Sequence, residues 1–128
     1  MSEQLAQQFI DAMHGLEERD DLDTLVAQYA EDATLTNVNL PEPMTGTAGV
    51  RKFWEDYRSL FSQIHSEFSH VVVQDNEAAL EWTSTGTLAS NCEPIEYDGV
   101  TMLTFRDGKV SAFRGYYDQI ALSQRTEV

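Results

Sequence analysis

The chain has 128 residues, 41% of them hydrophobic and 23% charged, which are the proportions of a single soluble globular domain. Its 22 acidic and 8 basic side chains give a net charge of −14. A surface of this sign repels nucleic-acid phosphates and anionic membranes, so we expect neither as a partner. Cys92 is the only cysteine, which excludes an intrachain disulfide and a structural zinc site. Together with the lack of a signal-peptide pattern, this predicts a cytoplasmic protein without a metal centre.

Two helices are predicted at the beginning of the chain. Between positions 3 and 19, apolar residues recur at helical spacing: Leu5, Phe9, Met13 and Leu16. A shorter helix is predicted over 22–30, with Asp21 as its N-cap. We interpret His14, which lies beside the apolar stripe, as a partly exposed helix residue.

A strand and the strongest helical pattern of the chain follow. Residues 33–39 alternate as a strand, with Leu35 and Asn37 on one face. Two prolines then interrupt the sheet pattern. A third helix is predicted from about residue 47 by an apolar stripe of Val50, Phe53, Trp54, Tyr57, Leu60, Phe61 and Ile64. Trp54 and Tyr57 carry polar tips, so they are candidates for the border of a cavity.

The second half of the chain is typical of an antiparallel meander, with strands over about 68–73, 77–88, 95–106 and 110–119. In the second of these strands one face carries Ala78, Leu80, Trp82 and Ser84. We therefore predict an α+β fold in which N-terminal helices pack on the concave face of a curved, mostly antiparallel sheet, a cone-shaped α+β barrel. We expect the following side chains to be buried: Trp54, Trp82, Leu103 and Phe105.

The last strand has an unusual set of polar residues on one face. A period of two places Arg114, Tyr116 and Asp118 on the face that also carries Val110 and Ala112. If that face lines a cavity, Asp118 lies at its floor and is the best-placed proton-transfer group. The alternatives are that Asp118 orients a ligand, or that it is a structural residue paired with Arg114.

Four segments of the sequence resemble the SnoaL-like and nuclear-transport-factor-like superfamily. They are residues 29–35 (Tyr-Ala-Glu-Asp-Ala-Thr-Leu), 43–46 (Pro-Met-Thr-Gly), 107–110 (Asp-Gly-Lys-Val) and 116–118 (Tyr-Tyr-Asp). Polyketide cyclases, limonene epoxide hydrolase and ketosteroid isomerase belong to this group. The resemblance covers nearly the whole chain and implies one SnoaL-like domain over 1–128. It specifies the fold more strongly than the function, because the same scaffold also hosts binding domains.

The catalytic positions of two of these enzymes are altered here. The aspartate base of ketosteroid isomerase corresponds to Asn37 here. Its oxyanion-hole tyrosine corresponds to a position near Met13, and its oxyanion-hole carboxylic acid to a position near Thr101. These differences argue against that isomerase chemistry. Limonene epoxide hydrolase is similar in its asparagine at Asn37 and its closing aspartate at Asp118. Its arginine and neighbouring aspartate appear here as Trp82 and Ser84, and its tyrosine as Leu35, so the water-activating triad is incomplete.

The aspartate at position 118 also resembles the acid–base residue of SnoaL-like polyketide cyclases, which need no cofactor. This implies a cofactor-free cyclase or isomerase acting on a hydrophobic carbonyl compound, with Asp118 and Asn37 as catalytic residues. The expected substrate-binding residues are Trp54, Tyr57, Trp82, Ser84, Thr101, Arg114 and Tyr116. The alternatives are a non-catalytic ligand-binding or dimerisation domain, and an epoxide hydrolase with an altered triad.

Relatives commonly associate through the outer face of the sheet, which implies a homodimer for this chain. The corresponding outward positions are Thr83, Thr85, Met102 and Thr104.

Overall fold

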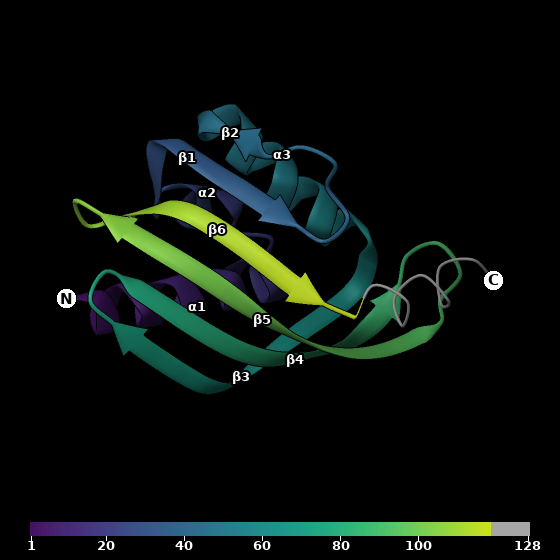
Figure 1. Cartoon of the computed structure of the whole chain (residues 1–128). Helices are drawn as coiled ribbons and strands as arrows, with labels where there is room; N and C mark the ends of the chain where they lie inside the picture. The colour runs from purple at the N-terminus through teal and green to yellow at the C-terminus, as the bar shows by residue number, and fades with distance from the viewer. Residues whose placement is uncertain (119–128) are drawn as a thin grey trace.

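The computed structural model describes residues 1–118, which form three helices and six strands joined by turns and loops (Figure 1). The helices are Ser2–Arg19 (α1), Leu22–Val26 (α2) and Gly46–Ser59 (α3). The strands are Tyr29–Asn37 (β1), Met44–Thr45 (β2), Phe61–Gln74 (β3), Glu77–Leu88 (β4), Pro94–Arg106 (β5) and Lys109–Tyr117 (β6). Gln119, the predicted end of the last strand, lies outside the described residues.

All six strands form one sheet in the order β2-β1-β6-β5-β4-β3. Neighbouring strands are antiparallel except for the parallel pair β1 and β6. The long strands curve around the helices, which lie on one side of the sheet (Figure 1). The predicted fold class, α+β with helices on a curved and mostly antiparallel sheet, is confirmed.

The main core lies between the helices and the inner face of the sheet. α1 contacts β3, β4 and β5, while α3 contacts β1. Trp54, Leu103 and Phe105 are buried as predicted, whereas Trp82 is half-buried. Asp21 caps α2 as predicted, because its carboxylate accepts from the backbone N–H of Thr24 at 3.1 Å. None of the helices in residues 1–118 combines the length and apolar character that crossing a bilayer requires.

The third helix is shorter than its apolar stripe predicts. It ends at Ser59, and both Phe61 and Ile64 lie in β3. Ser62 is an extra residue in β3 opposite β4, and its hydroxyl donates to the carbonyl of Thr87 at 3.2 Å. This β-bulge keeps Phe61 and Ile64 on the same face although they are three residues apart. The pair therefore imitates helical spacing within a strand.

Candidate functional site

A cavity of about 250 Å³ lies between the helices and the inner face of the sheet. Its wall is mostly apolar and aromatic, and includes Phe9, Met13, Phe53, Trp54, Phe68, Trp82, Tyr97 and Phe113. Three of the residues that line it are exposed: Asn39, Asp56 and Leu60. The volume is just below the usual range of about 300–1,000 Å³ for ligand cavities. A compact molecule with one or two rings matches this size.

Most of the predicted site residues line this cavity: Asn37, Trp54, Tyr57, Trp82, Ser84 and Thr101. They come from β1, α3, β4 and β5, so the fold brings together residues that are far apart in the sequence. The Trp82 indole N–H donates to the Thr101 hydroxyl at 3.0 Å, which holds the indole against β5. Gly99 permits this position, because a Cβ added there would lie 2.4 Å from an indole carbon of Trp82.

The prediction that Asp118 lies at the floor of the cavity is wrong. Asp118 is exposed and outside the cavity wall, and Tyr116 is 49% exposed. Arg114 also lies outside the wall, with its guanidinium 3.9 Å from the carboxylate of Glu77. We therefore assign no acid–base role to Asp118.

A β-bulge at Ser111 is the physical reason for this error. Val110 and Ala112 pair with consecutive residues of β5, so Ser111 is an extra residue in β6. The alternation changes face at this point. Phe113, Gly115 and Tyr117 consequently line the cavity, and the polar residues between them point away.

Asn37 lines the cavity, and its side-chain oxygen is already hydrogen-bonded. Its side-chain oxygen accepts from the backbone N–H groups of Asn39, at 2.8 Å, and Leu40, at 3.0 Å. With its oxygen occupied, the amide NH₂ is the group that remains for a ligand. The predicted role of Asn37 as a donor to a carbonyl or enolate oxygen fits this geometry, and stays a prediction.

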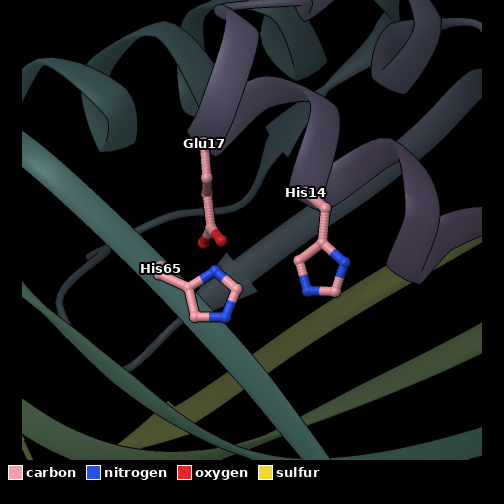
Figure 2. Close-up of side chains that lie close together, drawn as sticks. All are labelled: His14, Glu17 and His65. Carbon is pink, nitrogen blue, oxygen red and sulfur yellow. The ribbon is translucent and has the colours of Figure 1, made fainter.

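Glu17 is the residue that the sequence analysis missed. It lies on α1 with only 4% of its surface exposed. Figure 2 shows its carboxylate directed from α1 toward β3, close to the imidazoles of His14 and His65. Phe9, Met13 and Glu17 follow one another at four-residue intervals and therefore share a helix face. An acidic residue that continues an apolar row was the available signal.

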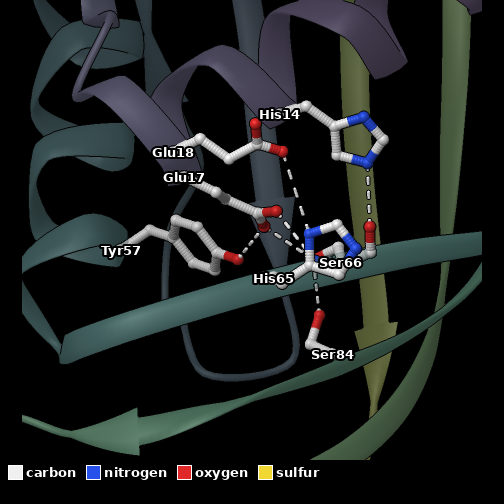
Figure 3. Close-up of polar contacts among 7 residues, drawn as sticks. All are labelled: His14, Glu17, Glu18, Tyr57, His65, Ser66 and Ser84. Carbon is white, nitrogen blue, oxygen red and sulfur yellow. Dashed lines mark hydrogen bonds and ion pairs between the residues drawn. The ribbon is translucent and has the colours of Figure 1, made fainter.

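Three donors converge on the Glu17 carboxylate (Figure 3). One oxygen accepts from the backbone N–H of Ser66 at 2.8 Å. The other accepts from the hydroxyls of Ser66, at 2.6 Å, and Tyr57, at 2.8 Å. The Ser66 hydroxyl is also 2.6 Å from the Ser84 hydroxyl. Since Tyr57, Ser66 and Ser84 line the cavity and Glu17 does not, the carboxylate lies directly behind the polar part of the wall.

The same network supplies hydrogen-bond partners for backbone groups on the unpaired edge of β3. Ser66 pairs with Ser84 across β3 and β4, and its own N–H and C=O face α1. Glu17 accepts from that N–H, and the ring nitrogen Nε2 of His14 donates to that C=O at 2.9 Å. Two side chains of a helix thus take the place of a neighbouring strand. This fixes the position of Glu17 relative to the cavity.

His14, Glu17 and His65 place one potential metal-ligand atom each within 4.8 Å of one another, and we assign no metal to them. The Nε2 atom of His14 carries the proton that bonds the Ser66 carbonyl, so it has no lone pair to offer. The two imidazoles are stacked at a centroid distance of 5.4 Å with an angle of 15° between their planes. A metal ion lies in the plane of each imidazole that binds it, and two nearly parallel planes do not meet at such an ion.

Burial and charge perturb Tyr57 at this site. Removal of its phenol from water, and the negative charge of Glu17 beside it, raise the pKa of Tyr57 well above its ordinary value. The phenol therefore stays protonated at neutral pH and acts as a donor to Glu17.

The helices, the curved sheet and the cavity between them define an NTF2-like α+β cone. Within this class the chain belongs to the SnoaL-like domain family, whose sequence model matches residues 6–113. No curated protein sequence is significantly similar to the chain.

Several solved structures share the fold over almost the whole chain. An NTF2-like protein of unknown function from Burkholderia pseudomallei K96243 has a TM-score of 0.87 and 16% identity, covering 99% of this chain and 98% of its own. TerC, co-crystallised with polyporic acid, has a TM-score of 0.83 and 16% identity, with coverages of 99% and 98%. A protein from Jannaschia sp. CCS1, provisionally assigned as a SnoaL-like polyketide cyclase, has a TM-score of 0.79 and 14% identity, with coverages of 92% and 90%. Identities this low show the fold alone.

Proposed function

We propose that the chain is an acid–base enzyme that moves a proton on a small hydrophobic carbonyl compound, as a cyclase or an isomerase does. The observation that carries this proposal is the connection of the buried Glu17 carboxylate to the cavity through two hydroxyls, those of Ser66 and Ser84. The apolar wall supports a hydrophobic substrate. Similarity to TerC with its polyporic acid, and to the Jannaschia protein, supports ring-containing substrates.

The proposed proton transfer uses groups of this chain only. The substrate carbonyl oxygen accepts a hydrogen bond from the Asn37 amide, which stabilises the enolate that forms. The proton that leaves the adjacent carbon passes to the Ser84 oxygen as the Ser84 proton moves to Ser66 and the Ser66 proton moves to Glu17. The negative charge thereby shifts from Glu17 to the enolate oxygen. Return of the proton to another atom completes an isomerisation, and attack of the enolate on a second carbonyl closes a ring.

A second candidate is a ligand-binding domain without turnover. Glu17 receives all three of its hydrogen bonds from the protein, and such a network also suits a purely structural carboxylate. We do not propose epoxide hydrolysis of the limonene type. Among the described residues no arginine lines the cavity, and the one carboxylate on its wall, Asp56, is exposed and paired with Lys52 at 3.0 Å.

Hydrogen exchange on 2-tetralone tests the proposal. This two-ring ketone has acidic C–H groups beside its carbonyl, and their replacement by deuterium in D₂O is followed by NMR. We expect the wild-type protein to accelerate the exchange and Glu17→Gln to lower the catalysed rate by about 10²–10⁴-fold, the usual effect of losing a general base.

Glu18→Gln is the matched control, because Glu18 is the next residue of the helix and is exposed. It should keep the wild-type rate, and a urea titration should show that Glu17→Gln is folded. An equal rate in Glu17→Gln and wild type would contradict the proposal. Binding of 2-tetralone without any catalysed exchange would favour the ligand-binding domain.

A further inference from the structure

We infer that the polar part of the cavity wall, where Ser84 and Tyr57 lie, accepts hydrogen bonds from a ligand and donates none. The ligand class is therefore a hydroxylated ring compound, a phenol, an enol or a ring alcohol, whose O–H faces Ser84. This inference rests on the proposed function, in that the cavity binds a small apolar molecule.

Glu17 determines which groups in this network are hydrogen-bond donors. An ionised carboxylate accepts hydrogen bonds and has none to donate. Tyr57 and Ser66 therefore use their hydroxyl protons on Glu17, at 2.8 and 2.6 Å. Neither residue retains a proton for a second partner.

The donor in the hydrogen bond between Ser66 and Ser84 is determined by the bond that Ser66 makes to Glu17. The two hydroxyl oxygens are 2.6 Å apart, so one of them donates to the other. If Ser66 donated to Ser84, its lone pairs would face the Glu17 oxygen at 2.6 Å, which is strongly repulsive. Ser84 is therefore the donor, and its only proton points toward Ser66.

The hydroxyl oxygens of Ser84 and Tyr57 now have only lone pairs left, and both residues line the cavity. Ser84 is 1% exposed, so bulk water has little access to its lone pairs. A ligand O–H that faces Ser84 gains a hydrogen bond, whereas a carbonyl or ether oxygen meets another acceptor. The Asn37 amide, a donor, lies on β1, three strands away from β4 in the sheet. The cavity thus matches a molecule with a hydroxyl toward Ser84 and an oxygen acceptor toward Asn37.

Three naphthalene compounds separate hydrogen bonding from size. 2-Naphthol carries the donor, naphthalene is smaller and has no oxygen, and 2-methoxynaphthalene is larger and has only an acceptor. Trp54 and Trp82 line the cavity and are the two tryptophans of the chain, so their indole N–H signals report binding in an NMR titration. We expect the wild type to bind 2-naphthol about 5–10-fold more tightly than either of the other compounds, the usual effect of one buried neutral hydrogen bond.

Two variants test the assigned direction. Ser84→Ala should lower the affinity for 2-naphthol to that for naphthalene and leave naphthalene binding unchanged, whereas Ser90→Ala, on an exposed turn, should change neither. Glu17→Gln introduces an amide NH₂ that donates to Ser66, which reverses the two serine hydroxyls. It should therefore shift the preference from 2-naphthol toward 2-methoxynaphthalene.

The outcomes separate the two proposals. Equal affinities for the three compounds, or no effect of Ser84→Ala, would overturn this inference and leave an apolar ligand cavity in place. Failure of all three compounds to bind would overturn the proposed function and this inference together.

Discussion

Glu17 connects three elements through one side chain. Its carboxylate, on α1, accepts from Tyr57 of α3 and from both the backbone and the hydroxyl of Ser66 in β3. A buried carboxylate is tolerated only when donors replace the water it has lost, and here the protein supplies all of them. The residue therefore ties α1 to α3 and β3 directly behind the polar part of the cavity wall.

Tyr97, beside this network, predicts how stability changes at alkaline pH. Burial, with the charges of Tyr117 and Glu17 nearby, raises the pKa of Tyr97 above its ordinary value of 10.0. Above pH 10 the unfolded chain loses this proton and the folded chain keeps it, so the unfolded state binds fewer protons. The free energy of unfolding should therefore fall as pH rises, by up to about 1.4 kcal/mol per pH unit for this tyrosine, and be unaffected by it below pH 10.

Urea unfolding of wild type and Tyr97→Phe at pH 7, 10 and 11 measures this contribution. The variant lacks the titrating group, so its free energy of unfolding should fall less steeply between pH 10 and 11. The difference between the two proteins at pH 7 serves as the reference. Parallel pH profiles would show that Tyr97 titrates similarly in the folded and unfolded chains.

Three β-bulges, each centred on a serine, determine which side chains reach the cavity. Ser62, Ser69 and Ser111 are the extra residues in β3 and β6. Each donates its hydroxyl to a carbonyl of the opposite strand, at 3.2, 3.3 and 3.1 Å. At each bulge the backbone pairing between the strands is interrupted, and the serine hydroxyl supplies a side-chain hydrogen bond that partly compensates for it.

These bulges also mark the limit of what the sequence could predict. β4 and β5 pair without a register shift, and the faces expected for Trp82, Ser84 and Thr101 are correct. In β6 the alternation is interrupted at Ser111, so a strict period of two places Asp118 on the wrong face.

Glu17 was missed for a different reason. Its partners lie 40 and 49 residues away in the sequence, and only the packing of α1 on β3 brings them together.

Deletion of Ser111 tests the role of its bulge. Without the extra residue, Phe113 would turn outward and Arg114 inward, so we expect a loss of more than about 3 kcal/mol in the free energy of unfolding, or no folding. Ser111→Ala keeps the residue count and removes only one hydrogen bond, so it should cost about 1 kcal/mol. Urea titrations of both variants give the comparison. Similar losses would mean that the bulge does not set the faces of β6.

At the scale of the whole molecule, one sheet separates two concave surfaces. The cavity lies on the inner face, and a shallow hollow on the outer face is lined by residues that include Glu81, Asp98 and Tyr116. Trp82 and Tyr117 border both. The outer face also carries the positions for which a homodimer is predicted, and that association stays a prediction. A signal from Trp82 alone therefore does not distinguish a ligand in the cavity from one in the hollow.

The methionine methyl groups make that distinction directly. Met13 and Met44 line the cavity, whereas Met102 lies outside its wall on β5. With 2-naphthol bound to protein labelled at the methionine methyls, we predict nuclear Overhauser effects from the naphthol ring to Met13 and Met44 and none to Met102. Effects to Met102 without effects to Met13 would place the ligand on the outer face and contradict the assignment of the cavity as the functional site.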